Sequence, residues 1–149
     1  MTVHLFSDEL WLPRPLAEVF PFFADAHNLQ ILTPEWVNFK ILTPKPIPMR
    51  AGTKIDYQIR IHGVPVRWRT DITVWEPPHR FQDTQLRGPY RQWIHTHEFV
   101  EQDGGTWCRD RVEYAVWGGH MINRLFVRRD VEKIFRYRRE VLQRRFPAV

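Results

Sequence analysis

The clearest alternation of apolar and polar residues predicts a β-hairpin in the middle of the chain. Apolar residues alternate with polar ones over 55–61, and a second alternating run covers 64–74. Because successive side chains of a strand point to opposite faces, a two-residue turn at His62-Gly63 would bring the two apolar faces together. The same register would place Asp56 opposite Arg69 on the other face, as a cross-strand ion pair. The apolar and the charged positions therefore predict the same register.

Weaker patterns on both sides of the hairpin predict the other elements. Apolar spacing after Pro15 indicates a helix, which Pro21 would kink or shorten. An apolar stripe in the last segment indicates a long helix, but Ile122, Leu125 and Phe126 lie off the stripe, so we expect it to start late or to bend. In chain order the predicted elements are a strand at 2–12, two short helices between Pro15 and Pro34, a strand at 36–43, the hairpin, strands at 80–87, 90–100 and 106–117, and a helix from about Met121 to Phe146.

These elements predict an α+β fold. Long strands joined by short turns favour a seven-stranded antiparallel sheet with one face in solvent and the other covered by the last helix. The chain has 149 residues and is expected to form one domain, residues 1–149. Its seven Trp and ten Phe either fill a large core or line a space for a large apolar ligand.

The stretch GPYRQWIHTHEF, from Gly88 to Phe99, places two histidines on one face of a strand. Trp93, His95, His97 and Phe99 share that face. A two-residue turn within 103–105 would set this face beside the even-numbered residues of the next strand, Cys108, Asp110, Val112, Tyr114 and Val116. The opposite face joins Glu98 with Arg109, Arg111 and Glu113 and is expected to face solvent. His95, His97 and Asp110 are therefore predicted to point toward the last helix.

Polar groups on a covered face need partners, because burial without them is costly. His97 and Asp110 could pair across the two strands. Arg138 falls near the centre of the apolar stripe of the last helix, and a buried arginine needs an anion, either Asp110 or the head group of a ligand. Each of these residues could instead be structural, with Arg138 extending to solvent at the helix edge.

A metal site is the alternative interpretation of the His-x-His pattern. Two histidines in this spacing direct their imidazoles the same way, and Asp110 or Cys108 could add a ligand. A third ligand has to be assumed, however, and HTHE differs from the helical HExxH motif. We therefore expect no metal.

Charge and cysteine content narrow the classes of partner. The net charge of +5 comes from the C-terminal segment, since residues 121–149 hold nine Lys or Arg and three Asp or Glu. That segment could bind a partner through Arg128, Arg129 and Arg136, but no motif indicates nucleic acid, and none is expected. A single cysteine and the lack of a long apolar run predict a cytoplasmic protein without stable membrane insertion, as a monomer or homodimer.

The order of the elements resembles that of the START-like, or SRPBCC, ligand-binding superfamily, which has the helix-grip fold. The phrases FFADAHNLQILTPEW, VRWRTDITVWEPPHRFQD, GPYRQWIHTHEF, DRVEY and FVRRDVEKIFRYRRE resemble a little-characterised bacterial branch close to polyketide cyclases and dehydrases. The resemblance implies a curved sheet wrapped around the C-terminal helix, with a cavity between them for a lipid, a polyketide or a similar molecule. It implies no cofactor. No motif assigns the chain to a catalytic branch, so no catalytic residue carries over from it.

Three hypotheses about function follow. The favoured one is a protein that binds a hydrophobic or amphiphilic small molecule. The second is a cyclase- or dehydratase-type enzyme in which His95 or His97 removes a proton next to a carbonyl and Arg138 stabilises the enolate. The third is partner binding through the basic helix or through Trp107 and Trp117. The candidate ligand-binding residues are Tyr57, Trp68, Trp93, His95, His97, Phe99, Asp110, Tyr114, Ile134 and Arg138.

Overall fold

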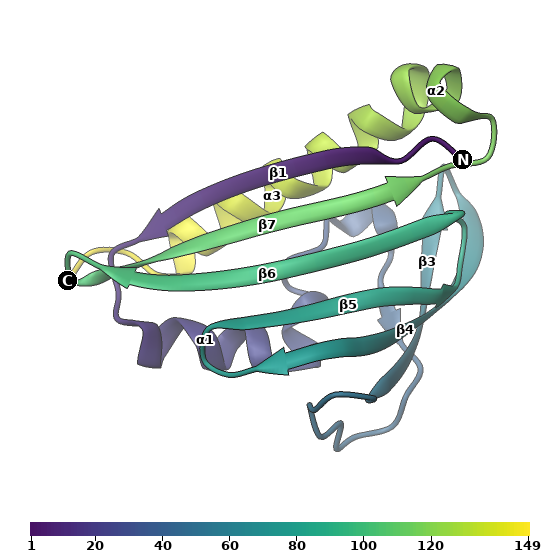
Figure 1. Cartoon of the computed structure of the whole chain (residues 1–149). Coiled ribbons are helices and arrows are strands. Elements are labelled where there is room, and N and C mark those ends of the chain that lie inside the picture. The colour runs from purple at the N-terminus through teal and green to yellow at the C-terminus, as the bar shows by residue number, and fades with distance from the viewer.

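The seven strands form one antiparallel sheet in the computed structural model, which describes residues 1–149. Their spatial order is β1-β7-β6-β5-β4-β3-β2, so the first and last strands of the chain are neighbours (Figure 1). The strands are β1 (His4–Leu12), β2 (Lys40–Ile41), β3 (Lys54–Ile61), β4 (Val64–Glu76), β5 (Arg80–Arg87), β6 (Gln92–Gln102) and β7 (Gly105–Ala115).

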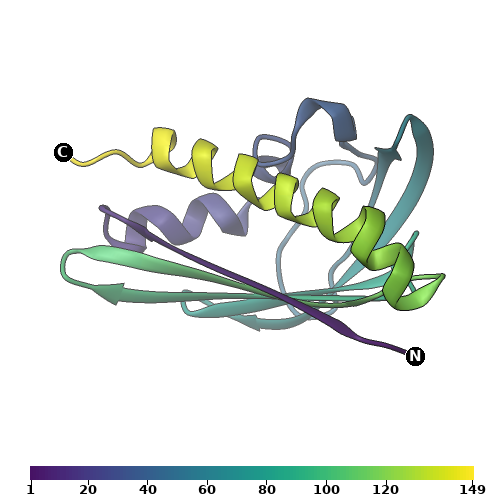
Figure 2. The same cartoon turned by 90° about the horizontal axis from the view of Figure 1, so that it is seen from above.

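The helices all lie on one side of this sheet (Figure 2). The longest, α3 (Arg128–Arg145), crosses the sheet and has α1 (Leu16–Ala24) beside it. The shorter segments are the 3-10 turns η1 (Ala26–Leu29) and η2 (Glu35–Val37), the one-turn helix α2 (Gly119–Ile122) and the π-helical segment η3 (Asn123–Val127). A curved antiparallel sheet closed by a long C-terminal helix is the helix-grip fold, and that prediction is confirmed.

The central hairpin has the predicted register. Tyr57 lies opposite Trp68 and Asp56 opposite Arg69, whose Nε is 3.1 Å from Asp56 Oδ1. The turn residues His62 and Gly63 have φ of 48° and 82°. Positive φ at both positions is what a tight turn needs to follow the twist of two antiparallel strands, and Gly63 adopts it without strain.

Two predicted elements differ from the structure. The strand expected at 36–43 is reduced to the two residues of β2, because the chain first forms the turn η2 after Pro34 and then reverses at Asn38, with φ of 49°. The last helix begins at Gly119 and contains the π-helical segment η3. One extra residue in a turn rotates all later side chains, which explains why Leu125 and Phe126 lie off the apolar stripe. Pro21 is exposed and lies inside α1, which continues to Ala24.

The buried apolar residues form three clusters under the helices. Phe20 and Phe23 of α1 pack with Phe81 and Phe99 of the sheet. Val131 and Phe135 of α3 belong to the second cluster, and the third surrounds the hairpin. Buried polar side chains lie on the same face of the sheet as these clusters. None of the helices combines the length and the apolar character that a membrane-spanning helix requires.

Candidate ligand-binding cavity

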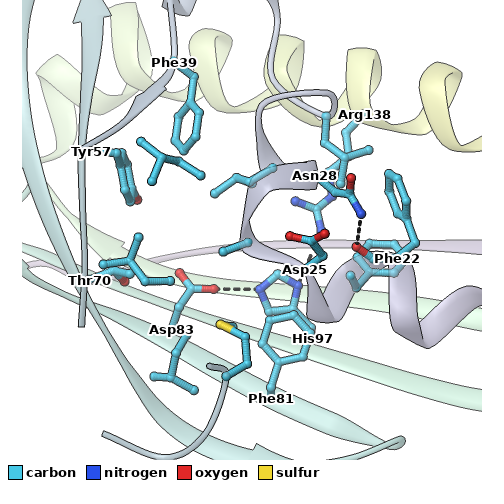
Figure 3. A pocket seen from close by; sticks show the side chains of 18 residues that line it. Phe22, Asp25, Asn28, Phe39, Tyr57, Thr70, Phe81, Asp83, His97 and Arg138 are labelled. Atoms are coloured by element: carbon cyan, nitrogen blue, oxygen red, sulfur yellow. Dashed lines mark hydrogen bonds and ion pairs between the residues drawn. The ribbon is translucent and has the colours of Figure 1, made fainter. Parts of the chain in front are cut away.

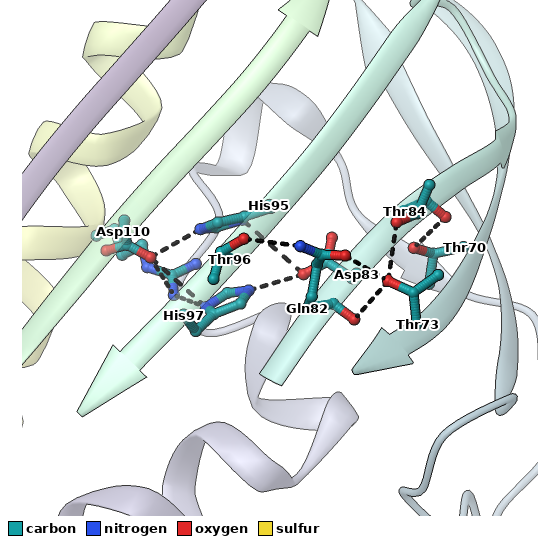
Figure 4. A network of polar contacts seen from close by, with 10 residues as sticks. Thr70, Thr73, Gln82, Asp83, Thr84, His95, Thr96, His97 and Asp110 are labelled. Atoms are coloured by element: carbon teal, nitrogen blue, oxygen red, sulfur yellow. Dashed lines mark hydrogen bonds and ion pairs between the residues drawn. The ribbon is translucent and has the colours of Figure 1, made fainter. Parts of the chain in front are cut away.

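The strand register brings a set of polar residues to the covered face of the sheet. Gln102 pairs with Gly105 across a two-residue turn, which places His97 opposite Asp110 as the sequence predicts. On the other side of β6, His95 lies opposite Asp83 of β5. His95 and His97 are each only 5% exposed. Three neighbouring strands therefore contribute Asp83, His95, His97 and Asp110 to one buried group of polar side chains (Figure 4). Together with Arg138 of α3, these residues are called the polar cluster.

Each histidine of the polar cluster bonds to an aspartate on a different strand. His95 Nε2 lies 2.7 Å from Asp110 Oδ1, and His97 Nε2 lies 2.7 Å from Asp83 Oδ2. His97 and Asp110 do lie opposite each other as a cross-strand pair, with His97 Nδ1 3.5 Å from Asp110 Oδ1, but the short hydrogen bonds of both imidazoles go to other carboxylates. Diagonal neighbours on adjacent strands are within reach of long side chains, so each imidazole bonds to a diagonal carboxylate and not to the one directly opposite.

Ring stacking fixes the orientation of both imidazoles. The ring centroids of His95 and His97 are 3.7 Å apart with an interplanar angle of 26°. Phe81 stacks on the other face of His97 at 4.1 Å. The three rings form a continuous stack, which holds the imidazole planes and leaves only their edges available for hydrogen bonds.

Arg138 reaches the polar cluster from α3. Its Nη2 lies 3.4 Å from His97 Nδ1 and 3.6 Å from Asp110 Oδ1, and its Nε has no hydrogen-bond partner. The guanidinium carbon lies 5.5 Å from the centre of the Phe23 ring and 5.7 Å from that of Phe135. Of the two anions considered for this buried arginine, the structure provides Asp110.

Burial and neighbouring charges set the protonation of the polar cluster. Loss of hydration, helped by the nearby His95, lowers the pKa of His97 to about 4. Burial alone would raise the pKa of Asp110, but the Arg138 charge and the His95 hydrogen bond outweigh it and hold the pKa below its usual range. Burial also opposes ionisation of Asp83, whose pKa is nevertheless lowered by the hydrogen bond from His97. His97 is therefore neutral at neutral pH, while both aspartates are charged.

These charges determine which imidazole nitrogen carries the proton. A guanidinium can only donate, so His97 Nδ1 accepts from Arg138 and His97 Nε2 donates to Asp83. His95 Nε2 donates to the charged Asp110, which can only accept. His95 Nδ1 makes no hydrogen bond, and its closest carboxylate oxygen, Asp83 Oδ2, is 3.9 Å away. The two aspartates and Arg138 together contribute a net charge of −1 to the polar cluster.

Three of these residues have the composition of a metal site. One ligand atom each from Asp83, His95 and His97 lies within 4.8 Å of the others. One ion can take the lone pairs of both imidazoles only if the two ring planes converge on it. The rings are instead stacked, and His97 Nε2 is bonded to Asp83. Metal binding would therefore require one ring to turn out of the stack.

A cavity of about 360 Å³ opens beside the polar cluster, between the sheet and α3. A smaller cavity of about 70 Å³ adjoins it toward α1 (Figure 3). Both are lined by Asp83, His97 and Arg138, so the polar cluster stands where the two cavities meet. Most lining residues of the larger cavity are apolar or aromatic, and the indole nitrogen of Trp68 is buried there without a partner.

Seven of the ten candidate residues line the larger cavity: Tyr57, Trp68, Trp93, His95, His97, Ile134 and Arg138. The other three share the covered face but lie outside the cavity. Phe99 packs against Phe20 and Phe23 of α1. Asp110 contacts the histidines but does not itself line the cavity. Tyr114 is fully buried, and its hydroxyl donates a hydrogen bond to Asn123 Oδ1 at 2.7 Å. Strand parity gives the face of a residue, but which part of that face stays open depends on where the helices pack.

Asp83 is the functional candidate that sequence reasoning missed. It carries the hydrogen bond to His97 and lines both cavities. A signal was present, because Phe81 and Asp83 share one face of their strand and Phe81 is a large apolar residue that marks the covered face. The sequence also predicted that Trp107 and Trp117 are exposed and could bind a partner. In the structure Trp117 is exposed, whereas Trp107 is half-buried.

Comparison with known proteins places the chain in a family. The family described as polyketide cyclase / dehydrase and lipid transport matches residues 12–137. The chain belongs to this family, since the match covers most of its length. Comparison with curated proteins gives no match.

Solved structures agree on the fold. Ginseng major latex-like protein 151 from Panax ginseng has a TM-score of 0.72 at 6% identity, covering 97% of this chain and 98% of that one. The Zhui aromatase/cyclase from Streptomyces sp. R1128 has a TM-score of 0.69 at 13% identity, covering 96% of each chain. A norcoclaurine synthase from Thalictrum flavum, in complex with a transition-state analogue, has a TM-score of 0.67 at 12% identity, covering 97% of this chain and 96% of that one. At these identities the likeness establishes the fold alone.

Proposed function

We propose that this protein binds an amphiphilic small molecule in the cavity between its sheet and α3. The observation that carries the proposal is the larger cavity of about 360 Å³, which combines an aromatic wall with one polar cluster. Its volume falls within the range typical of small-molecule sites, about 300–1,000 Å³. The apolar part of the ligand would pack on Tyr57, Trp68 and Trp93, and burial of that surface would supply most of the affinity at about 25 cal/mol per Å².

The charges of the polar cluster favour a neutral head group over a carboxylate. Arg138 already faces Asp110, and the two aspartates and Arg138 together contribute a net charge of −1. A ligand carboxylate would add a second negative charge in a buried place, which is costly. A hydroxyl or carbonyl group adds no charge. A hydroxyl can donate to His95 Nδ1, which makes no hydrogen bond to the protein, and a carbonyl can accept from Arg138, which lines the cavity.

Ligand binding can be tested first on the protein as purified. Native mass spectrometry followed by organic extraction should detect a co-purifying amphiphile. A neutral fluorescent probe, N-phenyl-1-naphthylamine, should bind with enhanced emission, and Ile134→Trp, which fills the cavity from α3, should abolish the enhancement. Ile94→Trp, on the solvent face of β6, is the matched control and should bind the probe like wild type. Equal emission from both variants would contradict the proposal.

One observation favours a second candidate, an enzyme that removes a proton next to a carbonyl. His95 lines the cavity, Asp110 fixes its Nε2–H tautomer, and its Nδ1 is free to accept a proton. The resulting imidazolium would lie between Asp110 and Asp83 and would bring the net charge of the polar cluster to zero. The positive charge of Arg138, which lines the cavity, would stabilise the enolate. Once a substrate is identified, the His95→Gln variant should bind that substrate without converting it. Full turnover by both the His95→Ala and the His97→Ala variants would exclude this mechanism.

A further inference from the structure

Exposed apolar side chains gather around the mouth of the larger cavity. Trp36, Trp117 and Ile122 line the cavity and are also exposed to solvent. Three more exposed apolar residues, Met121, Leu125 and Phe126, belong to the same short segment as Ile122. These six side chains are 36% to 69% exposed, and together they form the apolar rim. Exposed apolar surface of this kind usually marks an interaction site.

The local backbone explains why these side chains face outward. Gly118 and Gly119 have φ of 89° and 64° and turn the chain from β7 into α2. In the helical turns that follow these glycines, the buried side chain is a polar one, Asn123. It accepts a hydrogen bond from the Tyr114 hydroxyl at 2.7 Å. An amphipathic helix normally buries its apolar face. Here the anchored polar residue holds the segment with its apolar side in solvent.

Positive charge surrounds the apolar rim. The segments at this end of the molecule, 60–67, 87–91 and 117–130, contain seven arginines and one aspartate (Figure 1), and the segment 35–37, which carries Trp36, adds one glutamate. The aspartate, Asp130, is occupied by His62 at 3.0 Å. The segments at the opposite end, 76–80, 101–105 and 140–145, contain three arginines and four acidic residues. Arg91 lies 4.8 Å from the centre of the exposed Trp117 ring, so charge and apolar surface occupy the same place.

We infer that the apolar rim docks onto the surface of an anionic lipid bilayer, with the mouth of the cavity facing the membrane. Apolar side chains among arginines are the composition of segments that lie in the lipid interface, where rings and aliphatic groups enter the acyl region and arginines meet the phosphates. A second copy of the chain fits less well, because a symmetric contact would bring the arginines of both copies together. The docking is peripheral, and it does not depend on the cavity holding a ligand.

Vesicle binding tests this inference. The protein should sediment with vesicles of phosphatidylcholine mixed with phosphatidylglycerol, and much less with phosphatidylcholine alone. Added salt should weaken the binding, because it screens the arginines. The double variant Leu125→Ser/Phe126→Ser should bind at least about tenfold more weakly, and Arg91→Glu/Arg124→Glu should lose a similar factor, since each basic residue near an anionic surface contributes about fivefold.

The matched control removes apolar side chains of similar exposure elsewhere. Leu42→Ser/Val100→Ser should bind vesicles like wild type. Equal binding to neutral and anionic vesicles, or undiminished binding by the Leu125→Ser/Phe126→Ser variant, would overturn the inference. So would a wild-type dimer in analytical ultracentrifugation that the same variant converts to monomer. All variants should still bind the fluorescent probe, so loss of docking is distinguishable from loss of the cavity.

Discussion

At the scale of single residues, the polar cluster is a set of buried charges that depend on one another for stability. Asp110 has two roles, because it accepts the hydrogen bond that fixes His95 and provides the anion for Arg138. A buried charge that loses its partner is strongly destabilising, whereas an ion pair at the surface contributes little. The cluster should therefore contribute to stability as well as to binding.

Asp110→Asn tests this dependence. The variant keeps the shape of the side chain but removes the carboxylate that pairs with the buried Arg138, so the free energy of unfolding should fall by about 3 kcal/mol. Asp56→Asn, which removes the exposed partner of Arg69, should cost about 1 kcal/mol or less. Urea unfolding of both variants measures the difference. Equal losses would show that Asp110 does not stabilise Arg138.

Cys108 offers a second test at this scale. Burial, reinforced by the Asp110 charge, raises the pKa of its thiol to about 12. At pH 8 only about one thiol in ten thousand would then be ionised, and the thiolate is the form that reacts. A thiol reagent at pH 8 should label the protein only as fast as it unfolds, and the labelled fraction should rise with urea along the unfolding curve. Rapid labelling of the native protein would contradict the burial of Cys108.

The sequence predicted the direction of these side chains better than their partners. Alternation along a strand places His95, His97 and Asp110 on the covered face, because the period of a strand is two residues. The bond between His97 and Asp83 depends on which of two diagonal carboxylates is nearer and on the stack with Phe81. Those are properties of packing between strands, and no periodicity along the chain contains them.

At the scale of elements, local signals decided which predictions succeeded. The central hairpin was predictable because its apolar and charged positions require the same register. The strand expected at 36–43 failed because Asn38 adopts a left-handed conformation, which an asparagine tolerates at little cost. The π-helical segment was visible only as an offset in the apolar stripe, because the contact of Tyr114 with Asn123 joins a strand to the helical segment after it and neither period describes it.

Tyr114→Phe should loosen this segment. Removal of the hydroxyl leaves Asn123 Oδ1 buried without a donor, which should cost about 1–3 kcal/mol. Hydrogen exchange should accelerate over residues 119–127 more than in β6. Tyr137→Phe is the control, since the Tyr137 hydroxyl makes no hydrogen bond to the protein, and it should change stability little. If both variants exchange alike, the contact does not anchor the segment.

At the scale of the whole molecule, the sheet and α3 enclose a space instead of packing fully against each other. The three apolar clusters hold the two layers together around the cavity. A ligand that binds only the folded protein stabilises it by mass action, and at one hundred times its dissociation constant the gain is about 2.7 kcal/mol. For a chain of this length that gain corresponds to a rise in Tm of about 5–10 °C.

This rise gives a prediction that separates the cavity from the apolar rim. The neutral probe at saturating concentration should raise the Tm of wild type and of the Leu125→Ser/Phe126→Ser variant equally, because neither substituted side chain lines the cavity. Ile134→Trp should show no rise, since the indole occupies the space that the probe needs, and Ile94→Trp should behave like wild type. Thermal unfolding followed by circular dichroism measures all four proteins. A rise that is lost in the Leu125→Ser/Phe126→Ser variant but kept in Ile134→Trp would mean that the probe binds at the rim and that the cavity between the sheet and α3 is not the binding site.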